Sequence, residues 1–343
     1  MRPQETTPVT IREVARRSGV SIATVSRVLN NVPGTVRDEL QRRVRKAAQE
    51  LDYRPNALAR SLHQRRTHTI GLIITDIANP YYAGITRGIE AVSRKHGYAL
   101  FFCNTDGRPS ALAYYIDVLR DNRVDAIIIG GGGTASRQQF QALHDRRIVA
   151  VLIGRYNVPL PAVRIDNVTG GWQAASHLLQ LGHRRIAVLA VPTTSTGMRD
   201  RLRGICRAMA EQRIAFRKEL LVRCGLPLAS ALQGAMLLMS KTPRPTAIIA
   251  ANDQMAITAM HGVEKFGLRV PEDVSIVGFD NIELASYVRP ALTTMGVPLY
   301  DIGVAAAETA IGLLTGMPVS KQTWLAPELI IRASTTRPPA AQP

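Results

Sequence analysis

The sequence predicts a small all-α N-terminal headpiece followed by an α/β core of two parallel-sheet subdomains. Residues 10–51 carry apolar residues at helical spacing, interrupted by turn signals. From Thr69 onward, short apolar strands alternate with amphipathic helices, which is typical of parallel sheets with helices on both faces. A chain of 343 residues with a hydrophobic fraction of 46% is long enough for two or three domains with buried cores.

The stretch TIREVARRSGVSIATVSRVLNNVPGT, residues 10–35, predicts two short helices joined by a tight turn. Thr10 can cap the first helix, and Glu13 completes a capping box. Gly19 provides a permissive turn residue, and Ser21 can cap the second helix. The second helix is predicted to bury Val25, Val28 and Leu29 and to expose Ile22, Ala23, Ser26 and Arg27. Short side chains and one arginine on such a helix fit a DNA major groove, although similar helix pairs occur in proteins that never bind DNA.

The positive charge of the chain is concentrated near its N-terminus. Residues 1–66 contain 14 Lys and Arg against 6 Asp and Glu, a net charge of +8, whereas the whole chain carries +17. A concentrated basic segment is the electrostatic footprint of a phosphate-binding surface. The charge therefore favours a helix-turn-helix that reads DNA over a solvated basic face without a partner.

Two further helical segments precede the core. A basic helix is predicted over residues 37–51. Pro55 then opens a segment in which residues 56–62 would form barely two helical turns, too few for stability in isolation. We expect this segment to be a hinge that becomes ordered on DNA. The expected organisation is a headpiece (1–54), a hinge helix and linker (55–68), a core (69–335) and a disordered tail (336–343).

The core divides into two consecutive sets of strands and helices. Strands are predicted at residues 70–75, 98–104, 124–130 and 148–154, and then at 185–190, 219–224, 246–251 and 275–279. Helices are predicted at residues 82–96, 110–122, 136–145, 169–181, 199–213, 229–240 and 254–266. Two such sets indicate two similar subdomains with a cleft between them, and ligands bind these sheets at the carboxyl ends of the strands.

The cysteines and the N-terminus indicate the cellular compartment. Cys103, Cys206 and Cys224 have no CxxC spacing, so we expect reduced thiols and no zinc or other metal site. The first ten residues, MRPQETTPVT, are polar and do not resemble a signal peptide. No apolar run is long enough to span a membrane. We therefore expect a cytoplasmic protein without a membrane partner.

The chain resembles the LacI/GalR family of bacterial transcriptional regulators over essentially its full length. The headpiece resembles the family in VTIREVARRSGVSIATVSRVLNN and LDYRPNALARSL, and the core in GLIITDIANPYY, LGHRRIAVL, IIAANDQMAITAM, GLRVPEDVSIVGFDN, PALTTM and ELIIRAST. The resemblance implies a DNA-binding headpiece, a hinge helix and a core similar to periplasmic sugar-binding proteins. It also implies a homodimer, expected to be a repressor, on a pseudo-palindromic double-stranded DNA operator, controlled by a small-molecule effector such as a sugar or sugar derivative.

The resemblance assigns DNA-binding roles by position. Ile22 and Ala23 match the residues that set operator preference, and Arg27 can bind guanine O6 and N7. Leu62 matches a leucine that the family inserts into the central minor groove, where such a side chain kinks the duplex. The other positions implied to cap helices, hold phosphates or belong to the hinge are Thr10, Ser21, Thr24, Ser26, Asn30, Asn56 and Ala59.

The resemblance also implies an effector site in the cleft. Arg201 and Asp280 match a charged pair that grips a sugar or similar molecule, since each group can bind vicinal hydroxyls with two hydrogen bonds. Asn252 matches a polar cleft residue, and Tyr81 matches an aromatic position that packs on a ring. Further expected effector-binding residues are Asp76, Arg155 and Asp166, for which ordinary polarity at strand ends is the alternative.

The chain departs from the family pattern at several positions. Arg37 stands where the family has a serine or threonine that caps the third helix, and Leu40-Gln41 replaces its Thr-Arg pair, which puts that cap and one phosphate contact in doubt. Gly154 replaces an aspartate of some members, so the identity of their effectors cannot be carried over. No leucine heptads follow the core, and we expect a dimer.

Two other classes of function compete with regulation. A cytoplasmic solute-binding protein without sequence-specific regulation fits the core but leaves the headpiece unexplained. An α/β enzyme is disfavoured because the glycine run at 130–133 lacks the Lys-Ser/Thr ending of a P-loop. The histidines form no HExxH motif, and no serine lies in a GxSxG elbow. We expect no catalytic residues and no cofactor.

Overall fold

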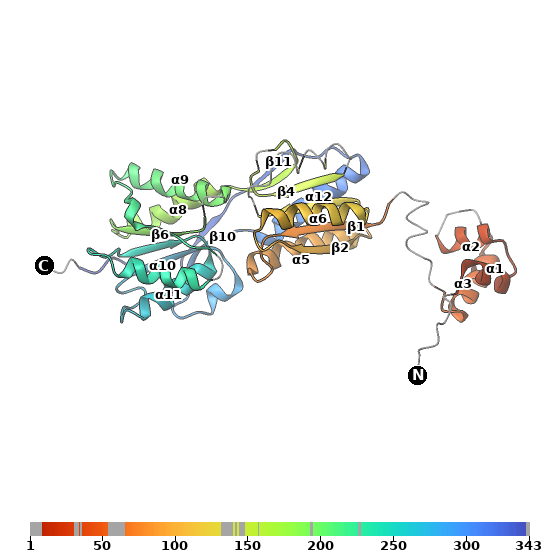
Figure 1. The fold of residues 1–343 in the computed structure, drawn as a ribbon, viewed down its shortest axis with the longest axis horizontal. Coiled ribbons are helices and arrows are strands. Elements are labelled where there is room, and N and C mark those ends of the chain that lie inside the picture. Colours follow the sequence, from red (N-terminus) through yellow and green to blue (C-terminus); the bar gives the residue numbers. More distant parts are fainter. Residues whose placement is uncertain are drawn as a thin grey trace. The chain divides into compact units, whose positions relative to one another are not determined.

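The computed structural model describes residues 9–30, 34, 36–53, 66–131, 140, 143, 148–156, 158–192, 195–225 and 228–340. The chain forms two compact units, residues 1–67 and 68–343 (Figure 1). The described elements of the first unit are helices, and the second unit contains two sheets with their covering helices. This architecture confirms the predicted fold class.

The described residues of the headpiece form three helices, α1 (Ile11–Ser18), α2 (Ile22–Leu29) and α3 (Asp38–Glu50). Their apolar faces meet in a small core in which Val14, Val25 and Val44 are fully buried. Gly19 ends α1 in the left-handed conformation, with a φ of 64° that residues with a side chain rarely adopt. The predicted helix-turn-helix is therefore present.

The starts of α1 and α2 are capped as the sequence predicts. The backbone N–H of Thr10 donates to Glu13 Oε2 at 2.6 Å, which ties the first turn of α1 to the residue before it. Ser21 Oγ accepts a hydrogen bond from the backbone N–H of Thr24 at 3.1 Å, so Ser21 caps α2. These bonds satisfy backbone donors that a helix leaves free at its N-terminus.

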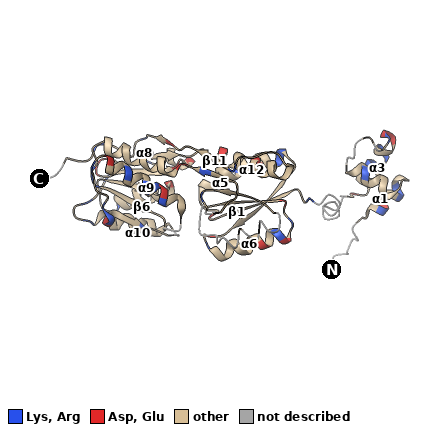
Figure 2. Cartoon of the chain, turned by 90° about the horizontal axis from the view of Figure 1, so that it is seen from above, with Lys and Arg blue, Asp and Glu red and all other residues tan. Residues whose placement is uncertain are grey.

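The start of α3 lacks such a cap. Arg37 precedes the helix and makes no side-chain capping bond, which confirms the doubt raised by the departure from the family pattern. Asp38 and Glu39 instead place two negative charges in the first turn, where they interact favourably with the helix dipole. Elsewhere the headpiece helices carry many Lys and Arg side chains (Figure 2).

The sheet of the N-terminal subdomain has six parallel strands in the order β11-β5-β4-β3-β1-β2. Its strands are β1 (Thr69–Ile74), β2 (Ala99–Asn104), β3 (Ala126–Gly130), β4 (Val149–Ile153), β5 (Ala162–Ile165) and β11 (Gln322–Leu325). Its described helices are α5 (Pro80–Lys95), α6 (Pro109–Asp121) and α12 (Leu299–Thr315). α5 and α12 pack against each other on one face, and Leu119 of α6 packs with Ile127 on the other.

The sheet of the C-terminal subdomain has the order β12-β10-β9-β8-β6-β7, and only β12 runs antiparallel to its neighbour. Its strands are β6 (Ile186–Ala190), β7 (Leu221–Arg223), β8 (Ala247–Ala250), β9 (Ser275–Asp280), β10 (Thr293–Gly296) and β12 (Glu328–Ile330). Its described helices are α8 (Asn167–Gln180), α9 (Thr196–Glu211), α10 (Ala229–Met239) and α11 (Asp253–Glu264), with short 3-10 turns at Lys218–Leu220 and Glu283–Ser286. α8 packs with α9 and α10 packs with α11 (Figure 1).

The chain crosses between the two subdomains three times, after β5, after β10 and after β11. As a result, α12 and β11 from the end of the chain complete the N-terminal subdomain. The alternating sequence pattern predicts neither β5 nor the elements after residue 280. β5 has only four residues, and α12 is apolar on most of its surface, so neither shows a clear amphipathic period.

Three other expectations concern the rest of the core. The helix predicted near 136–145 lies largely outside the described residues. The tail expected to be disordered from residue 336 is still bonded there, because the backbone N–H of Thr336 donates to Ser275 Oγ at 3.0 Å and its carbonyl accepts from His183 Nε2 at 2.9 Å. Within the described part of the chain, no helix is both long enough and apolar enough to cross a membrane.

Candidate DNA-binding surface and effector cavity

The second helix of the headpiece exposes the side chains predicted to read DNA. Ile22 is 45% exposed, and Ala23 and Arg27 on the same side of α2 are also exposed. Val25 and Val28, on the opposite side, are buried against the other two helices. The structure therefore separates the α2 residues that hold the headpiece together from those that are available to base edges.

The polar residues around α2 make bonds that fix the helix. Ser21 Oγ lies 2.9 Å from Thr24 Oγ1 in addition to its capping bond. Asn30 Nδ2 donates to Ser26 Oγ at 3.2 Å near the C-terminus of the helix. Hydroxyl and amide groups at the ends of a DNA-recognition helix can also bind phosphate oxygens. Such contacts orient the helix on DNA but do not distinguish one base sequence from another. The remaining predicted DNA-binding residues, Asn56, Ala59 and Leu62, lie outside the described part of the chain.

A cavity of about 560 Å³ lies between the two subdomains of the core, at the carboxyl ends of the strands. This position agrees with the ligand site expected for open parallel sheets. Six of the seven residues predicted to bind an effector line it: Asp76, Tyr81, Arg155, Arg201, Asn252 and Asp280. They come from both subdomains, so the structure brings together side chains far apart in the sequence.

Arg201, on α9, is held rigidly on one side of the cavity. Its Nε donates to Asn167 Oδ1 at 2.8 Å, and its Nη1 donates to the backbone carbonyl of Ala251. The guanidinium carbon also lies 3.5 Å from the centre of the Phe279 ring, a cation–π contact. Burial lowers the pKa of Arg201, and the charge of Asp280 opposes this shift. The guanidinium is therefore fixed in place before any ligand binds.

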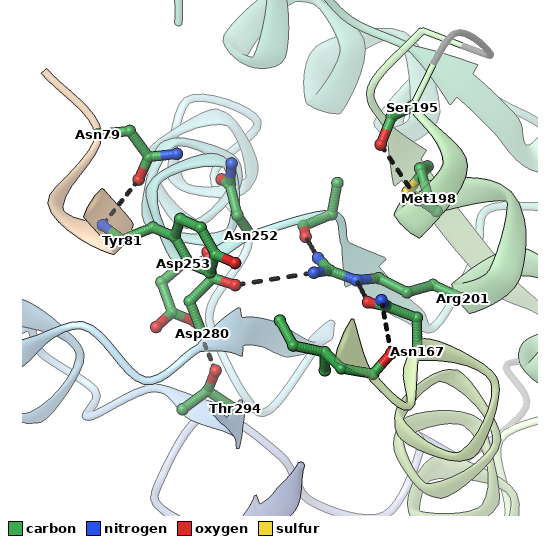
Figure 3. Close-up of polar contacts among 12 residues, drawn as sticks. Asn79, Tyr81, Asn167, Ser195, Met198, Arg201, Asn252, Asp253, Asp280 and Thr294 are labelled. Carbon is green, nitrogen blue, oxygen red and sulfur yellow. Dashed lines mark hydrogen bonds and ion pairs between the residues drawn. The ribbon is translucent and has the colours of Figure 1, made fainter. Parts of the chain in front are cut away.

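Asp280, at the end of β9, faces Arg201 across a gap (Figure 3). Its Oδ1 lies 3.8 Å from Arg201 Nη2, too far for a hydrogen bond, and accepts no hydrogen bond from the described residues. Burial raises the pKa of Asp280 well above its ordinary range, although Arg201 opposes the shift. A hydroxyl group placed here can donate to the carboxylate and accept from the guanidinium.

The backbone of Asp280 has a φ of 111°, a conformation that residues with a side chain rarely adopt. Asn281 follows it with a φ of 58°. Strained backbone of this kind costs about 1–3 kcal/mol per residue and clusters at binding sites. The strain and the unsatisfied carboxylate oxygen both occur at the residue for which the family resemblance implies ligand binding.

A second buried carboxylate, Asp253, lies beneath this part of the site at the start of α11. It accepts hydrogen bonds from the backbone N–H of Ile282 at 2.8 Å and from Thr294 Oγ1 at 2.5 Å. Burial raises the pKa of Asp253 to about 6, although these hydrogen bonds lower it. The Asp253 bonds fix the backbone that follows Asp280 and so help to hold the strained residue in place.

The other lining residues sit at helix starts and strand ends. Asn252 caps α11, because its Oδ1 accepts from the backbone N–H of Met255 at 2.8 Å. Tyr81 lies in the first turn of α5, where Asn79 Oδ1 accepts its backbone N–H at 3.0 Å. Asp76 Oδ1 accepts from the backbone N–H of Ala78 at 2.9 Å. The side chains of Asn252 and Asp76 therefore have a structural role besides their position in the cavity, whereas Tyr81 is held through its backbone.

Asp166 and Arg155 make polar contacts of their own. Asp166 is not among the residues that line the cavity, and its carboxylate caps α8 by accepting from the backbone N–H of Thr169 at 3.0 Å and from Thr169 Oγ1 at 2.6 Å. Its role as an effector ligand stays a prediction. Arg155 lines the cavity, but its Nε lies 3.3 Å from Asp200 Oδ2.

The sequence analysis missed Asn167, which lines the cavity and orients Arg201. Its Nδ2 donates to the carbonyl of Ile165 at 3.2 Å, so both the oxygen and the nitrogen of the Asn167 side-chain amide are hydrogen-bonded. Asp166 and Asn167 directly follow β5, and this pair of polar residues at the strand end is the signal that could have indicated Asn167. Other lining residues with polar side chains that were not singled out include Thr75, Asn79, Asp106, Arg108, Ser195 and Gln254.

Comparison with known proteins gives the family of the chain. The model described as "Bacterial regulatory proteins, lacI family" matches residues 10–56, and the model "Periplasmic binding proteins and sugar binding domain of LacI family" matches residues 67–322. The chain belongs to the LacI family. It is thus a DNA-binding transcriptional regulator with an effector-binding core.

Similar family members match along nearly their whole length. The HTH-type transcriptional regulator DegA of Bacillus subtilis is 36% identical over 95% of this chain and 98% of its own. The HTH-type transcriptional repressor PurR of Aliivibrio fischeri is 34% identical, with coverage of 95% and 98%. A crystal structure of the Lac repressor dimer bound to operator and an anti-inducer aligns with a TM-score of 0.87 at 28% identity, covering 96% of this chain and 100% of that one. A CelR–cellobiose complex aligns with a TM-score of 0.72 at 28% identity over 95% and 99%.

Proposed function

We propose that this LacI-family regulator is a repressor that binds a pseudo-palindromic operator as a homodimer and is controlled by a sugar or a related polyhydroxylated molecule in the core cavity. The observation that carries the effector part is the gap between Arg201 and Asp280. A fixed cation and an unsatisfied carboxylate oxygen 3.8 Å apart offer complementary partners to neighbouring hydroxyl groups. Relatives named for the ribose operon and for cellobiose support a sugar.

In this proposal the exposed side of α2 enters the major groove. Ile22 and Ala23 pack against thymine methyl groups, and Arg27 binds one guanine in each half-site. The two headpieces of a dimer would place their recognition helices about one DNA turn apart, roughly 34–36 Å. The residues proposed to hold phosphates, form the hinge or enter the minor groove are Thr10, Ser21, Thr24, Ser26, Asn30, Asn56, Ala59 and Leu62.

The effector controls DNA binding only through a difference in its affinity for two arrangements of the core. The proposed effector-binding residues are Asp76, Tyr81, Asn252, Arg201 and Asp280, with Asn167 as the residue that orients Arg201. Since they belong to both subdomains, a bound molecule would favour one arrangement of the subdomains over another. We further propose that the protein acts in the cytoplasm, where its operator lies, and that it catalyses no reaction.

The first experiment is selection of bound sequences from random DNA duplexes with the full-length protein at two salt concentrations. An enriched palindrome is the expected result, since phosphate contacts alone give salt-sensitive binding without sequence preference. The enriched duplex then serves as the probe for a panel of sugars, with operator release or recruitment as the readout. Binding without an enriched sequence would overturn the proposal in favour of a solute-binding protein.

A further inference from the structure

Two consecutive residues of α9 make ion pairs in different directions. Arg201 pairs with Asp280 and donates to Ala251, both in its own subdomain. Asp200 pairs instead with Arg155, which follows β4 in the N-terminal subdomain, with 3.3 Å between Asp200 Oδ2 and Arg155 Nε. The Arg155–Asp200 ion pair therefore spans the cleft beside the cavity.

A second contact crosses the cleft at the same place. Thr196, in the first turn of α9, donates its hydroxyl to the backbone carbonyl of Arg155 at 2.7 Å. Gln254 Nε2, at the start of α11, donates to the carbonyl of Ala78 at 3.2 Å and joins the subdomains at another point. Because these are side-chain contacts outside the chain crossovers, they can form and break as the cleft closes and opens.

Because Asp200 is buried, the Arg155–Asp200 ion pair matters most among the contacts that cross the cleft. The Asp200 side chain is only 12% exposed, and its Oδ1 accepts no hydrogen bond from the described residues. Its other cation is Arg203, one turn along the same helix, with Nη1 at 3.4 Å and a side chain that is 63% exposed. Arg203 lies on the same helix as Asp200 and moves with it, so of these two cations only Arg155 would separate from Asp200 when the cleft opens. A buried carboxylate that loses its cation is strongly destabilised.

We propose that Asp200 is a positioning residue that holds Arg155 across the cleft, so that the Arg155–Asp200 ion pair stabilises the closed arrangement of the subdomains. Arg155 then acts as a latch between subdomains and does not serve as an effector ligand. An effector group that drew Arg155 away would leave the Asp200 carboxylate buried without it. The inference rests on the proposed function only in naming the cavity that the latch closes.

The latch also lies next to the effector site along the chain. Arg201 presents its guanidinium to the cavity, and the preceding residue carries the interdomain ion pair on the same helix. A displacement of α9 by a ligand on Arg201 therefore changes the geometry of the Arg155–Asp200 ion pair directly.

The test measures the distance between the subdomains in the full-length protein. Spin labels are attached at Lys95 on α5 and Gln233 on α10, both exposed, in a background with Cys103, Cys206 and Cys224 replaced. Labelled protein is mixed with a large excess of unlabelled protein, so that electron–electron resonance reports distances within one protomer. Circular dichroism checks that every variant is folded.

We expect D200N and R155A each to broaden the distance distribution and lengthen its mean, and the double variant to add nothing further. R155K should retain most of the original distribution, because the charge is kept. R203A is the matched control, since it removes the Asp200 partner on the same helix, and should leave the distribution unchanged. An unchanged distribution in R155A, or equal broadening in R203A and D200N, would overturn the latch. If the latch variants behave as expected while no sugar alters operator binding, the effector proposal fails and the latch stands.

Discussion

A Cβ atom added to Gly171 would lie 2.0 Å from the backbone carbonyl oxygen of Arg201. The same applies in the opposite direction, because a Cβ on Gly204 would lie 2.0 Å from the carbonyl of Val168. Helices α8 and α9 therefore cross with their backbones in contact. The crossing fixes the depth at which Arg201 enters the cavity, so two glycines determine the position of the guanidinium that we propose binds the effector.

Replacing Gly171 with alanine should separate α8 from α9 and shift Arg201. Overpacking of this kind costs about 1–3 kcal/mol, and we expect a loss of that order in the free energy of unfolding, measured by urea denaturation. The response of operator binding to effector should weaken more than operator binding itself. G225A is the control for the free energy of unfolding, because a Cβ on Gly225 meets no atom within 4 Å; it does not control for the effector response, because Gly225 also lines the cavity. Equal losses in the two variants would contradict this account.

Arg27 should contribute sequence preference as well as affinity. We expect R27A to cost about 1–3 kcal/mol in operator binding and to relax the preference at one base pair of each half-site. Repeating the sequence selection with the variant measures both effects. If binding weakens by the same factor for every sequence and the salt dependence becomes shallower, Arg27 contacts a phosphate and the base assignment is wrong.

Asp280 should be needed for the effector and dispensable for DNA. Its carboxylate offers an unsatisfied acceptor in the cavity, which lies in a different compact unit from the headpiece. We expect D280A and D280N to abolish the effector response in an operator-release assay while leaving effector-free operator affinity within about threefold, since that factor corresponds to under 1 kcal/mol. Loss of both properties would indicate misfolding and would refute a ligand role.

The fold should become less stable in mild acid because of His183. Burial lowers the pKa of His183 below its ordinary value of 6.5, and its ring is bonded to Thr246, Ser275 and Thr336. The unfolded chain then takes up a proton near pH 6.5 that the folded chain resists, so this contribution to stability is complete above pH 6.5 and is lost as the pH falls below it.

Asp253 changes stability in the opposite direction as the pH falls. Its pKa is raised to about 6, so the folded protein binds that proton more tightly than the unfolded chain and gains stability in mild acid. The comparison of interest is therefore between the wild type and H183Q, which share Asp253. We expect H183Q to be less stable overall but to lose less stability between about pH 7.5 and about pH 5.5, measured by urea denaturation. Parallel losses in both proteins would exclude His183 as the group responsible.

Local features of this protein were predictable from sequence because local chemistry determines them. The capping pair Thr10 and Glu13, the turn at Gly19 and the buried face of α2 follow from spacing within a few residues. The early strands were predictable because each is a short apolar run between turn signals. The positions of Arg201 and Asp280 at one cavity were available only through the family resemblance, since 79 residues separate them.

What the sequence did not reveal depends on tertiary contacts. Asp166 and Asn167 are adjacent and similar in size, yet one caps α8 and the other orients Arg201, a difference determined by the position of α9. Arg155 was expected to bind the effector, with ordinary strand-end polarity as the alternative, and only the packing of α9 brings Asp200 to it. The left-handed backbone of Asp280 is likewise maintained by Asp253 and its neighbours and has no local sequence signal.

The three crossings of the chain between subdomains determine when each subdomain can complete its fold during synthesis. The two sheets receive their last strands, β11 and β12, from residues 322–330, and α12 of the N-terminal subdomain spans Leu299–Thr315. A growing chain that has reached residue 298 thus has neither sheet complete, and the first subdomain waits for almost the whole polypeptide to leave the ribosome. Nascent chains expose unfinished apolar surfaces and unpaired strand edges throughout this interval, and such surfaces favour aggregation. A premature stop before residue 322 would remove an edge strand, β11 or β12, from each subdomain.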